Sequence, residues 1–401
     1  MQFQEVIGQQ SVKQHLAEMV EHNRLSHALL FLGKEGSGAL PLALAFAQYI
    51  ICHKVAQPDP GPSLFGEADL GPRVMPTDSC GVCPACTKAA GLVHPDVHFT
   101  FPVITKKSGT PPVSADFISE WREFISQYPY GNVYDWLQFI GAENKQGNIT
   151  AHECNDIIRK LSLKSFESPY KILILWMPEY LGKEGNKLLK LIEEPPPNTL
   201  FILVAESEAN ILSTILSRCQ LVKVPALEGA EVAAALQARN GTAPDAAKRI
   251  GAISEGNYRE ALHLLQHADE DFYNLLRDWL NATIKNRHIE QGKIIDEISR
   301  LGRENQKQFL KYFTHLLEQA LKLHVLQGPA VEGVLQSLSE NEQAFAQRLN
   351  KVAGLEKQQA IIEELDKAAY YIERNANAKI LFHALTIRLQ HIIVHGVHIS
   401  V

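Results

Sequence analysis

The sequence predicts an α/β fold, a doubly wound parallel sheet, followed by a small helical part and an all-α C-terminal third. In the first half of the chain, short apolar runs alternate with segments of helical periodicity, which is typical of parallel strands joined by helices. From about Leu227 onward no strand pattern appears, and helical segments follow one another to the end. We therefore expect three domains, at residues 1–226, 227–268 and 269–401.

The composition is that of an ordinary globular protein. With 401 residues, 45% of them hydrophobic, the chain is long enough for two or three domains with cores of their own. No apolar run reaches membrane-spanning length, and the N-terminus lacks the basic and apolar blocks of a signal peptide. We expect a cytoplasmic protein without a membrane partner. The formal net charge of −6 argues against a protein that coats nucleic acid without specificity.

The first elements are a helix, a strand and a second helix. The helix expected over residues 11–23 has Ser11 as its cap, and an apolar strand follows at residues 27–32. The second helix, over residues 42–51, is rich in Ala and Leu and is expected to be buried nearly all round.

A glycine-rich loop joins this strand to the second helix. Gly33 and Gly38, with Gly36 between them, have the spacing of a phosphate-cradling P-loop. The next two positions should be Lys and then Ser or Thr, but they are Ala39, which has no charge, and Leu40, which cannot bind Mg²⁺. The loop thus has the glycines of a phosphate site without its chemical side chains. By itself, the spacing favours an ordinary strand-to-helix turn that binds no nucleotide.

Four cysteines form a candidate metal site. Residues 53–79 are rich in Pro and Gly and are expected to form a loop between the second helix and a CxxCxxC motif. Four thiolates are the ligand set of a structural Zn²⁺. The alternatives are free thiols, a site that uses His53 or His94, and an iron–sulfur cluster. The expected ligands are Cys52, Cys80, Cys83 and Cys86.

A second strand, over residues 97–103, precedes an insertion at residues 105–148. We expect a helix over residues 116–127 within it. The insertion is rich in aromatic residues and begins with Lys106 and Lys107, so its rings could stack on nucleic acid bases. Packing of the insertion on the main domain is the favoured interpretation.

The next strand, over residues 170–176, would carry a Mg²⁺-binding carboxylate at its end in a working P-loop ATPase. Here the strand ends in Trp176, and Glu179 follows too late, behind a proline. Thr150 and Glu153 have the spacing of a capping box and predict the start of the preceding helix.

The remaining elements follow from apolar periodicity and from glycine and proline stops. Strands are expected at 198–205 and 222–225, and helices at 186–194, 211–216, 231–239, 245–253, 258–268, 272–285, 288–301, 304–326, 330–336, 341–353, 355–375 and 378–394.

Together these motifs resemble bacterial clamp-loader subunits, AAA+ proteins of the DNA polymerase III holoenzyme. The resemblance covers residues 1–268, whereas the helical C-terminal third matches only in length and class. Within the family the gamma/tau subunits keep an intact P-loop and one group of subunits does not, and this sequence resembles the second group. The motifs that carry it are Gly8-Gln9, the loop at 33–40, the cysteines, His94-Pro95-Asp96, the block from Asn186 to Pro196, and Ser217-Arg218-Cys219.

The resemblance implies an AAA+ core, a helical lid and a C-terminal collar that closes a five-subunit ring. It implies gamma/tau and delta subunits as partners, and the sliding clamp and primer-template DNA as partners through the complex. Neighbouring subunits would hydrolyse ATP while this chain, without an ATPase of its own, offers Arg218 in trans. DNA polymerase activity would belong to the holoenzyme alone. Zn²⁺ would be a structural cofactor.

Two arginines are candidates for functional roles. A guanidinium presented to a γ-phosphate in trans stabilises the charge of the transition state and is worth roughly 10³ to 10⁵ in rate. The alternative for Arg218 is a surface arginine paired with a carboxylate. Arg259 matches the lid arginine of the family. Because the loop lacks its lysine, we expect Arg259 to be structural or vestigial. Likewise, Gly8-Gln9 is expected to be a turn before the first helix.

Two other functions remain open. One is an active, gamma/tau-like ATPase with a divergent P-loop, against which Ala39, Leu40 and Trp176 argue. The other is a zinc-containing nucleic-acid adaptor outside the replisome. Association with clamp-loader subunits would separate the adaptor from the first hypothesis.

Overall fold

The structure is a computed structural model of the chain. It describes residues 1–56, 76–106, 109, 111–142, 145–266, 272–326, 335, 338, 340–374 and 376–395. Contacts divide the chain into two compact units, Met1–Gly241 with Ser254–Ala261, and Thr242–Ile253 with Leu262–Val401. The three-domain division remains a prediction. Within the described ranges, no helix is both long and apolar enough to cross a membrane.

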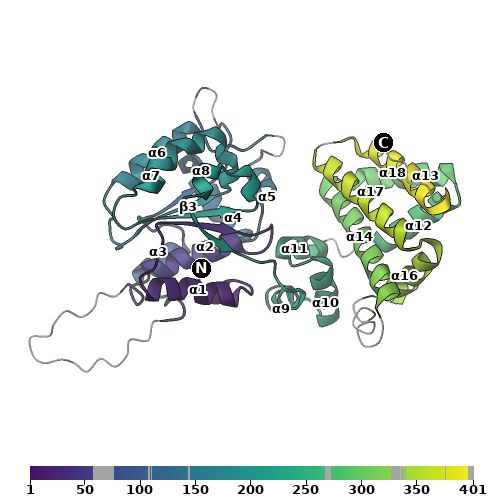
Figure 1. The fold of residues 1–401 in the computed structure, drawn as a ribbon, viewed down its shortest axis with the longest axis horizontal. Coiled ribbons are helices and arrows are strands. Elements are labelled where there is room, and N and C mark those ends of the chain that lie inside the picture. The colour runs from purple at the N-terminus through teal and green to yellow at the C-terminus, as the bar shows by residue number, and fades with distance from the viewer. Residues whose placement is uncertain are drawn as a thin grey trace, which may run out of the picture. The chain divides into compact units, whose positions relative to one another are not determined.

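The first unit is built on a parallel sheet that has five strands in the described part of the chain (Figure 1). The strand order is β2-β3-β4-β1-β5, so β1 lies between β4 and β5, and the order reverses beside it. On β1, Leu30 is paired with Leu203 of β4 and with Leu221 of β5. The strands are β1 (Ala28–Leu32), β2 (Val97–Thr100), β3 (Lys171–Trp176), β4 (Thr199–Ala205) and β5 (Gln220–Lys223).

Helices cover both faces of this sheet, as predicted for a doubly wound fold. Alternate residues of each central strand enter different apolar clusters: Leu29 and Phe31 one, Ala28 and Leu30 the other. The first cluster includes α1 (Gln10–Glu21), α2 (Ala39–Ile51), α3 (Pro84–Ala90), α4 (Ile118–Gln127) and α5 (Val133–Phe139). The second includes α6 (Ala151–Ser162), η3 (Pro178–Leu188), α7 (Leu189–Glu193) and α8 (Ser213–Leu216).

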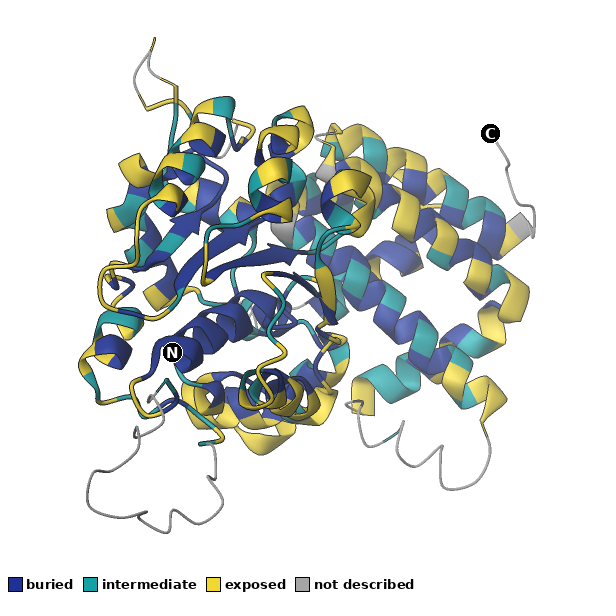
Figure 2. Cartoon of the chain, turned by 60° about the vertical axis from the view of Figure 1, so that its left-hand side comes forward, coloured by how far each residue is buried: buried dark blue, intermediate teal, exposed yellow. Residues whose placement is uncertain are grey.

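Helix α2 is buried at every residue, as its composition predicted (Figure 2). It begins three residues before the expected start and includes Pro41 in its first turn. Proline is tolerated there because the first N–H groups of a helix have no partner within the helix.

Two predicted helix caps differ from the structure. Helix α1 is preceded by Gln9 in the left-handed conformation, at φ 60°, so Ser11 is not its cap. Thr150 does cap α6 by accepting the N–H of Glu153. The Glu153 carboxylate does not complete the box, because it accepts from Thr100 Oγ1 at 2.8 Å and from the Ser114 N–H at 2.6 Å inside the core.

The insertion packs on the main domain, which confirms the favoured interpretation. Trp121, Phe124 and Trp136 are fully buried, and Trp121 stacks on Phe101 with 4.2 Å between ring centroids. Strand β2 ends at Thr100, three residues before the end that the sequence predicted. The insertion also contains the 3-10 turn η2 (Ser114–Phe117), and an isolated antiparallel bridge joins Val103 to Asn148.

The rest of the described chain is helical, as predicted. The second unit has its own apolar core, which contains the fully buried Trp279, Phe309, Phe313 and Phe382. The helix expected at 330–336 lies almost wholly outside the described residues. The remaining elements are η1 (Phe3–Glu5), η4 (Glu208–Asn210), α9 (Gly229–Asn240), α10 (Pro244–Ile253), α11 (Tyr258–Gln266), α12 (Phe272–Ile284), α13 (His288–Arg300), α14 (Arg303–Val325), α16 (Glu340–Val352), α17 (Leu355–Glu373), α18 (Ala378–Gln390) and the π turn η5 (His391–His395).

Candidate functional site

The glycine loop lies at the carboxyl end of β1, where the strand order reverses. Ligands of open parallel sheets bind at such a position. Gly36 and Gly38 have φ of 70° and 90°, which favours glycine. A Cβ on Gly36 would also lie 1.9 Å from Asn257 Oδ1. The backbone at both positions therefore requires glycine whether or not a phosphate binds.

Protein side chains fill most of the space in front of the loop. Tyr130 of the insertion lies over the start of α2, with its Cε1 only 3.0 Å from where a Cβ on Gly38 would be. The remaining cavity measures about 30 Å³ and is lined by loop residues, Tyr130, Trp176 and Glu206, among others. This volume suits one or two water molecules.

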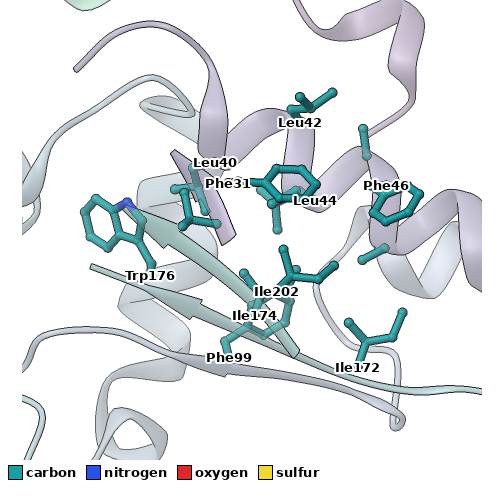
Figure 3. Packing of buried hydrophobic residues seen from close by; sticks show 14 of the residues in the cluster. Phe31, Leu40, Leu42, Leu44, Phe46, Phe99, Ile172, Ile174, Trp176 and Ile202 are labelled. Atoms are coloured by element: carbon teal, nitrogen blue, oxygen red, sulfur yellow. The ribbon is translucent and has the colours of Figure 1, made fainter. Parts of the chain in front are cut away.

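The two positions that would bind Mg²⁺ in a working ATPase are apolar and buried. Leu40 of α2 and Trp176 at the end of β3 belong to one apolar cluster, together with Phe31 and Ile202 (Figure 3). An aliphatic side chain and an indole offer no oxygen ligand to a hard cation.

Carboxyl groups lie where a phosphate site would need positive charge. Burial, together with the charges of nearby Glu35 and Glu179, raises the pKa of Glu206 to about 8. Glu179 accepts the backbone N–H of Glu206 at 2.7 Å and that of Ser207 at 2.9 Å. Neither side chain offers a phosphate the positive charge that it needs.

Glu35 of the loop is held by a polar network with Arg259 at its centre. Arg259 is only 4% exposed, and it binds both oxygens of Asp135 at 2.5 and 2.7 Å and Glu35 at 3.0 Å. Asn132 and Asn257 donate to Glu35 at 2.9 and 3.2 Å. Burial opposes ionisation of Glu35, but Arg259 and these donors outweigh it and hold its pKa below the ordinary value. Arg259 thus has a structural partner on the insertion.

Arg218 follows α8 and lies against the end of α7. Its Nε donates to Glu193 Oε1 at 2.6 Å, and its Nη2 bonds the same oxygen. Nη1 donates to the Thr214 carbonyl at 2.7 Å. The side chains of Arg218 and Glu193 are 32% and 44% exposed, so the pair lies at the surface. The fold thus joins the Glu193-Glu194-Pro195 block to the Ser217-Arg218-Cys219 motif.

The four predicted cysteines come together in one cluster. All four Sγ atoms lie within 4.8 Å of one another, and those of Cys80 and Cys86 are 3.9 Å apart. Four thiolates about 2.3 Å from a tetrahedral Zn²⁺ lie about 3.8 Å from one another, so the donor set fits a four-cysteine metal site. Cys52 ends α2, while Cys83 caps α3 and Cys86 lies in its first turn.

Backbone donors support the same sulfur atoms. The N–H groups of Cys80, Cys83 and Cys86 point at the sulfurs of Cys52, Cys80 and Cys83, at 3.3, 3.4 and 3.5 Å. Burial raises the pKa of Cys80, but N–H donors outweigh it and lower the value to about 6. Such donors stabilise the thiolate form that binds a metal.

His94 lies elsewhere, with its Nε2 3.3 Å from Glu167 Oε1, and in the described chain neither it nor His53 joins the cysteine cluster. Asp96 of the same motif accepts the N–H groups of Phe166, Glu167 and Ser168 at 2.5 to 2.8 Å. Burial opposes ionisation of Asp96, yet the three donors keep its pKa below the ordinary value. The His94-Pro95-Asp96 motif therefore fastens the turn before β3.

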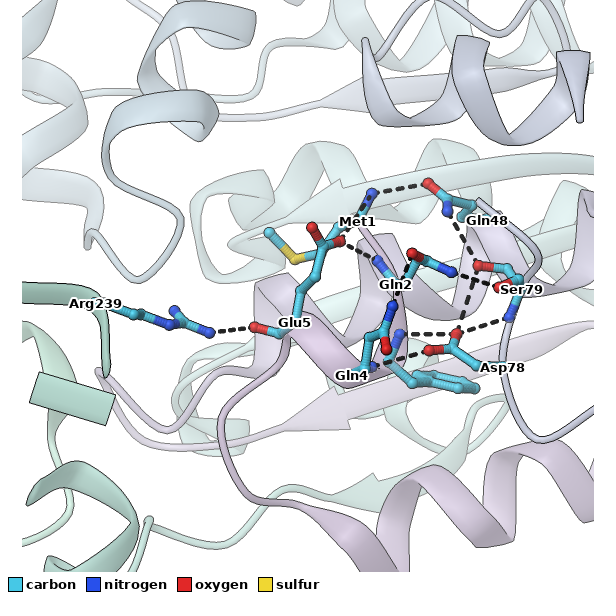
Figure 4. A network of polar contacts seen from close by, with 9 residues as sticks. Met1, Gln2, Gln4, Glu5, Gln48, Asp78, Ser79 and Arg239 are labelled. Atoms are coloured by element: carbon cyan, nitrogen blue, oxygen red, sulfur yellow. Dashed lines mark hydrogen bonds and ion pairs between the residues drawn. The ribbon is translucent and has the colours of Figure 1, made fainter. Parts of the chain in front are cut away.

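The N-terminal segment closes over the chain that leads into the cysteines (Figure 4). Asp78 accepts the N–H groups of Phe3 and Gln4, both at 2.9 Å, while Gln48 of α2 donates to Ser79 at 3.0 Å. Arg239 of α9 bonds the Glu5 carbonyl on the other side of the segment.

The sequence did not point to Asn132, Asp135 or Glu206, and it indicated Tyr130 only as one of the aromatic residues of the insertion. Only one local signal existed, the pair Asn132 and Asp135, which forms a reciprocal capping box at the start of α5. That pattern indicates a helix start and carries no information about Arg259, which lies 124 residues further along the chain.

A family model described as "DNA polymerase III, delta subunit" matches residues 8–228, more than half of the chain. The chain belongs to this family. It is 26% identical to DNA polymerase III subunit delta' of Bacillus subtilis over 220 residues, 55% of this chain and 48% of the relative. It is 27% identical to subunit delta' of Haemophilus influenzae over 206 residues, 51% of this chain and 45% of the relative.

Subunit tau of Bacillus subtilis is more distant, at 24% identity over 276 residues, 66% of this chain and 37% of the relative. The family model and the relatives named delta' confirm the predicted resemblance to this group of clamp-loader subunits. The chain spans about half the length of the delta' relatives that it matches. The observed fold is the AAA+ α/β core with a helical C-terminal domain that this family implied.

Proposed function

We propose that this chain is the delta prime subunit of a bacterial clamp loader. In this role it does not hydrolyse ATP but supplies Arg218 to the ATP site of a neighbouring subunit while the sliding clamp is loaded onto primed DNA. Its partners are gamma/tau and delta subunits, and it acts in the cytoplasm. DNA polymerase activity belongs to the holoenzyme. The curated relatives named delta' support this assignment.

The observation that carries the proposal is the glycine loop. Phosphoryl transfer needs cations around the γ-phosphate, a lysine and a bound Mg²⁺ above all. At this loop the corresponding positions are Ala39 and Leu40, and the space in front holds Tyr130 and Glu206. A chain with this loop contributes to ATP hydrolysis only through a residue that it offers to another subunit.

Arg218 has the chemistry for that contribution. Its guanidinium is permanently charged and can bind two phosphate oxygens at once. To reach a neighbour it must leave Glu193, but an exposed ion pair is worth only about 0 to 1 kcal/mol. A phosphate with two negative charges competes well against that single carboxylate.

The test is the ATPase rate of a complex reconstituted from this chain with the gamma/tau and delta subunits of its own organism. We expect Arg218→Ala to lower the DNA- and clamp-stimulated rate, because the site that loses its finger is slowed by roughly 10³. Arg218→Lys should restore little of this rate, since a lysine lacks the planar fork.

The control is Arg159→Ala, which removes another exposed arginine, 76% exposed and paired with Asp156. We expect this variant to leave the rate unchanged. An Arg218→Ala complex that assembles and hydrolyses ATP at the normal rate would disprove the trans role.

Zn²⁺ is the metal that we propose for the cysteine cluster. With four protein ligands it would have no open position, so its role would be to hold the end of α2 and the start of α3 together.

The alternative functions predict different results. DNA-stimulated ATP hydrolysis by the isolated chain would favour a gamma/tau-like motor. Failure to co-purify with the gamma/tau and delta subunits would favour a zinc-containing nucleic-acid adaptor.

A further inference from the structure

The insertion meets the glycine loop and the segment Ser254–Ala261 at a single place. From the insertion come Tyr130, Asn132 and Asp135, and from the loop comes Glu35. Arg259 comes from the 254–261 segment and binds both carboxylates. All of these residues belong to the first compact unit.

Asp135 presents its carboxylate to Arg259 as a bidentate partner. A guanidinium fork binds a carboxylate and a phosphate with the same two parallel N–H donors. The pair lies beside the glycine loop, where the phosphates of a nucleotide lie in an intact P-loop. An internal carboxylate therefore takes the partner that suits a phosphate.

The 254–261 segment is fastened to the loop at further points. The Tyr258 N–H donates to the Gly36 carbonyl at 3.2 Å, and Asn257 donates to Glu35. The Tyr258 ring meets the Tyr130 ring edge-on, with 4.9 Å between centroids.

We infer that the insertion is a built-in latch, in which Asp135 holds Arg259 and so keeps the 254–261 segment closed on the glycine loop without a nucleotide. The Asp135 carboxylate takes the place of a nucleotide phosphate as the partner of Arg259. The segment can therefore close on the loop without binding ATP. This gives the insertion, residues 105–148, a role that its sequence did not indicate.

The inference is tested on the isolated full chain by hydrogen exchange of the 254–261 amides. In the unmodified chain we expect slow exchange at Tyr258 and Glu260, whose N–H groups donate to Gly36 and to Asn257. Millimolar MgATP should leave this exchange unchanged. Fast exchange without nucleotide, or protection that appears only with MgATP, would overturn the inference.

Asp135→Asn keeps the size of the side chain but removes its charge. Arg259 then loses a charged, bidentate partner in a buried site, so we expect exchange across 254–261 to become at least tenfold faster. Asp116→Asn is the matched control, because Asp116 lies exposed in the same insertion, and we expect no change. Exchange in Asp135→Asn equal to that of the unmodified chain would contradict the latch.

Asp135 also takes part in the capping box of α5, so a second variant separates the two roles. Arg259→Lys leaves that box intact but loses the guanidinium fork. We expect it to speed exchange in 254–261 and not in α5, and the double variant to be less than additive. If the double variant speeds exchange by the combined effect of the two single variants, Asp135 and Arg259 act independently and the latch is wrong. These exchange experiments use the isolated chain, without other subunits. A negative result would therefore refute the latch and leave the proposed trans role of Arg218 untouched.

Discussion

Two glutamates beside the glycine loop behave differently because their partners differ. Glu35 has Arg259 and two side-chain amides as donors, and its pKa is held below the ordinary value although burial opposes this. Glu206 is half-buried, and burial together with the charges of Glu35 and Glu179 raises its pKa to about 8, which the charge of Arg259 offsets only in part. The opposite pKa shifts of the two glutamates thus follow from which of them is paired with Arg259.

Glu206→Gln should therefore change how stability depends on pH. In the folded chain Glu206 titrates at about 8 and in the unfolded chain at its ordinary 4.5. Its favourable contribution is complete below the unfolded pKa and is lost as the pH rises through the folded pKa. At pH 8 we expect the variant to be more stable than the original by roughly 2 to 4 kcal/mol, and near pH 4.5 to be equal to it.

Urea unfolding at the two pH values measures this difference. Glu208→Gln, at an exposed position two residues away, is the control. A difference between Glu206→Gln and the original chain that is the same at pH 4.5 and pH 8 would show that Glu206 is not held as a neutral acid.

At the scale of elements, two helix ends build the cysteine cluster. Cys52 stands where α2 ends, and Cys83 and Cys86 stand where α3 begins, with Cys80 in the chain before it. Helix α2 also carries the glycine loop at its other end, so a metal at the cysteines would fix the helix on which the loop is built. This couples the two features that the sequence presented separately.

Cys83→Ser should lower the zinc content and the stability of the chain together. We expect about one zinc per chain by elemental analysis in the original protein. In the variant we expect a loss of about 3 kcal/mol or more in the free energy of unfolding, because removing a metal site is among the costly substitutions. Cys219→Ser, at a cysteine outside the cluster, should keep the metal. Purified protein without metal but with intact thiols would contradict the assignment.

At the scale of the whole molecule, the second unit has a core of its own. Its apolar cluster draws every buried member from between Phe272 and Ile393, all within the predicted 269–401 domain. A core that needs no residues from the sheet is sufficient for independent folding of a domain of this size.

The fragment 269–401 should accordingly fold by itself. We expect a helical circular-dichroism spectrum and a single cooperative thermal transition. A helical spectrum without a cooperative transition would show that the unit depends on the rest of the chain, and would argue against the predicted boundary near residue 269.

The sequence by itself determined the parallel sheet, the positions of most helices, the four cysteines and the family. These features are local: apolar alternation, glycine spacing and CxxCxxC are all read within short windows of the chain. Leu40 and Trp176 were identified as unable to bind Mg²⁺ from residue type alone, and their burial in one cluster agrees with that. The Ser11 cap failed because a left-handed residue before α1, Gln9, shifted the helix start.

Only the tertiary structure decided what occupies the space in front of the glycine loop. Asp135 and Arg259 are 124 residues apart, and no periodicity in either segment encodes their pairing. The pairing of Glu193 with Arg218 is likewise not encoded in either local segment. Nor is the contact of Glu153, whose carboxylate accepts the Ser114 N–H in the core instead of capping its own helix. Long-range pairs of charges depend on how the segments pack, and packing is a property of the folded chain.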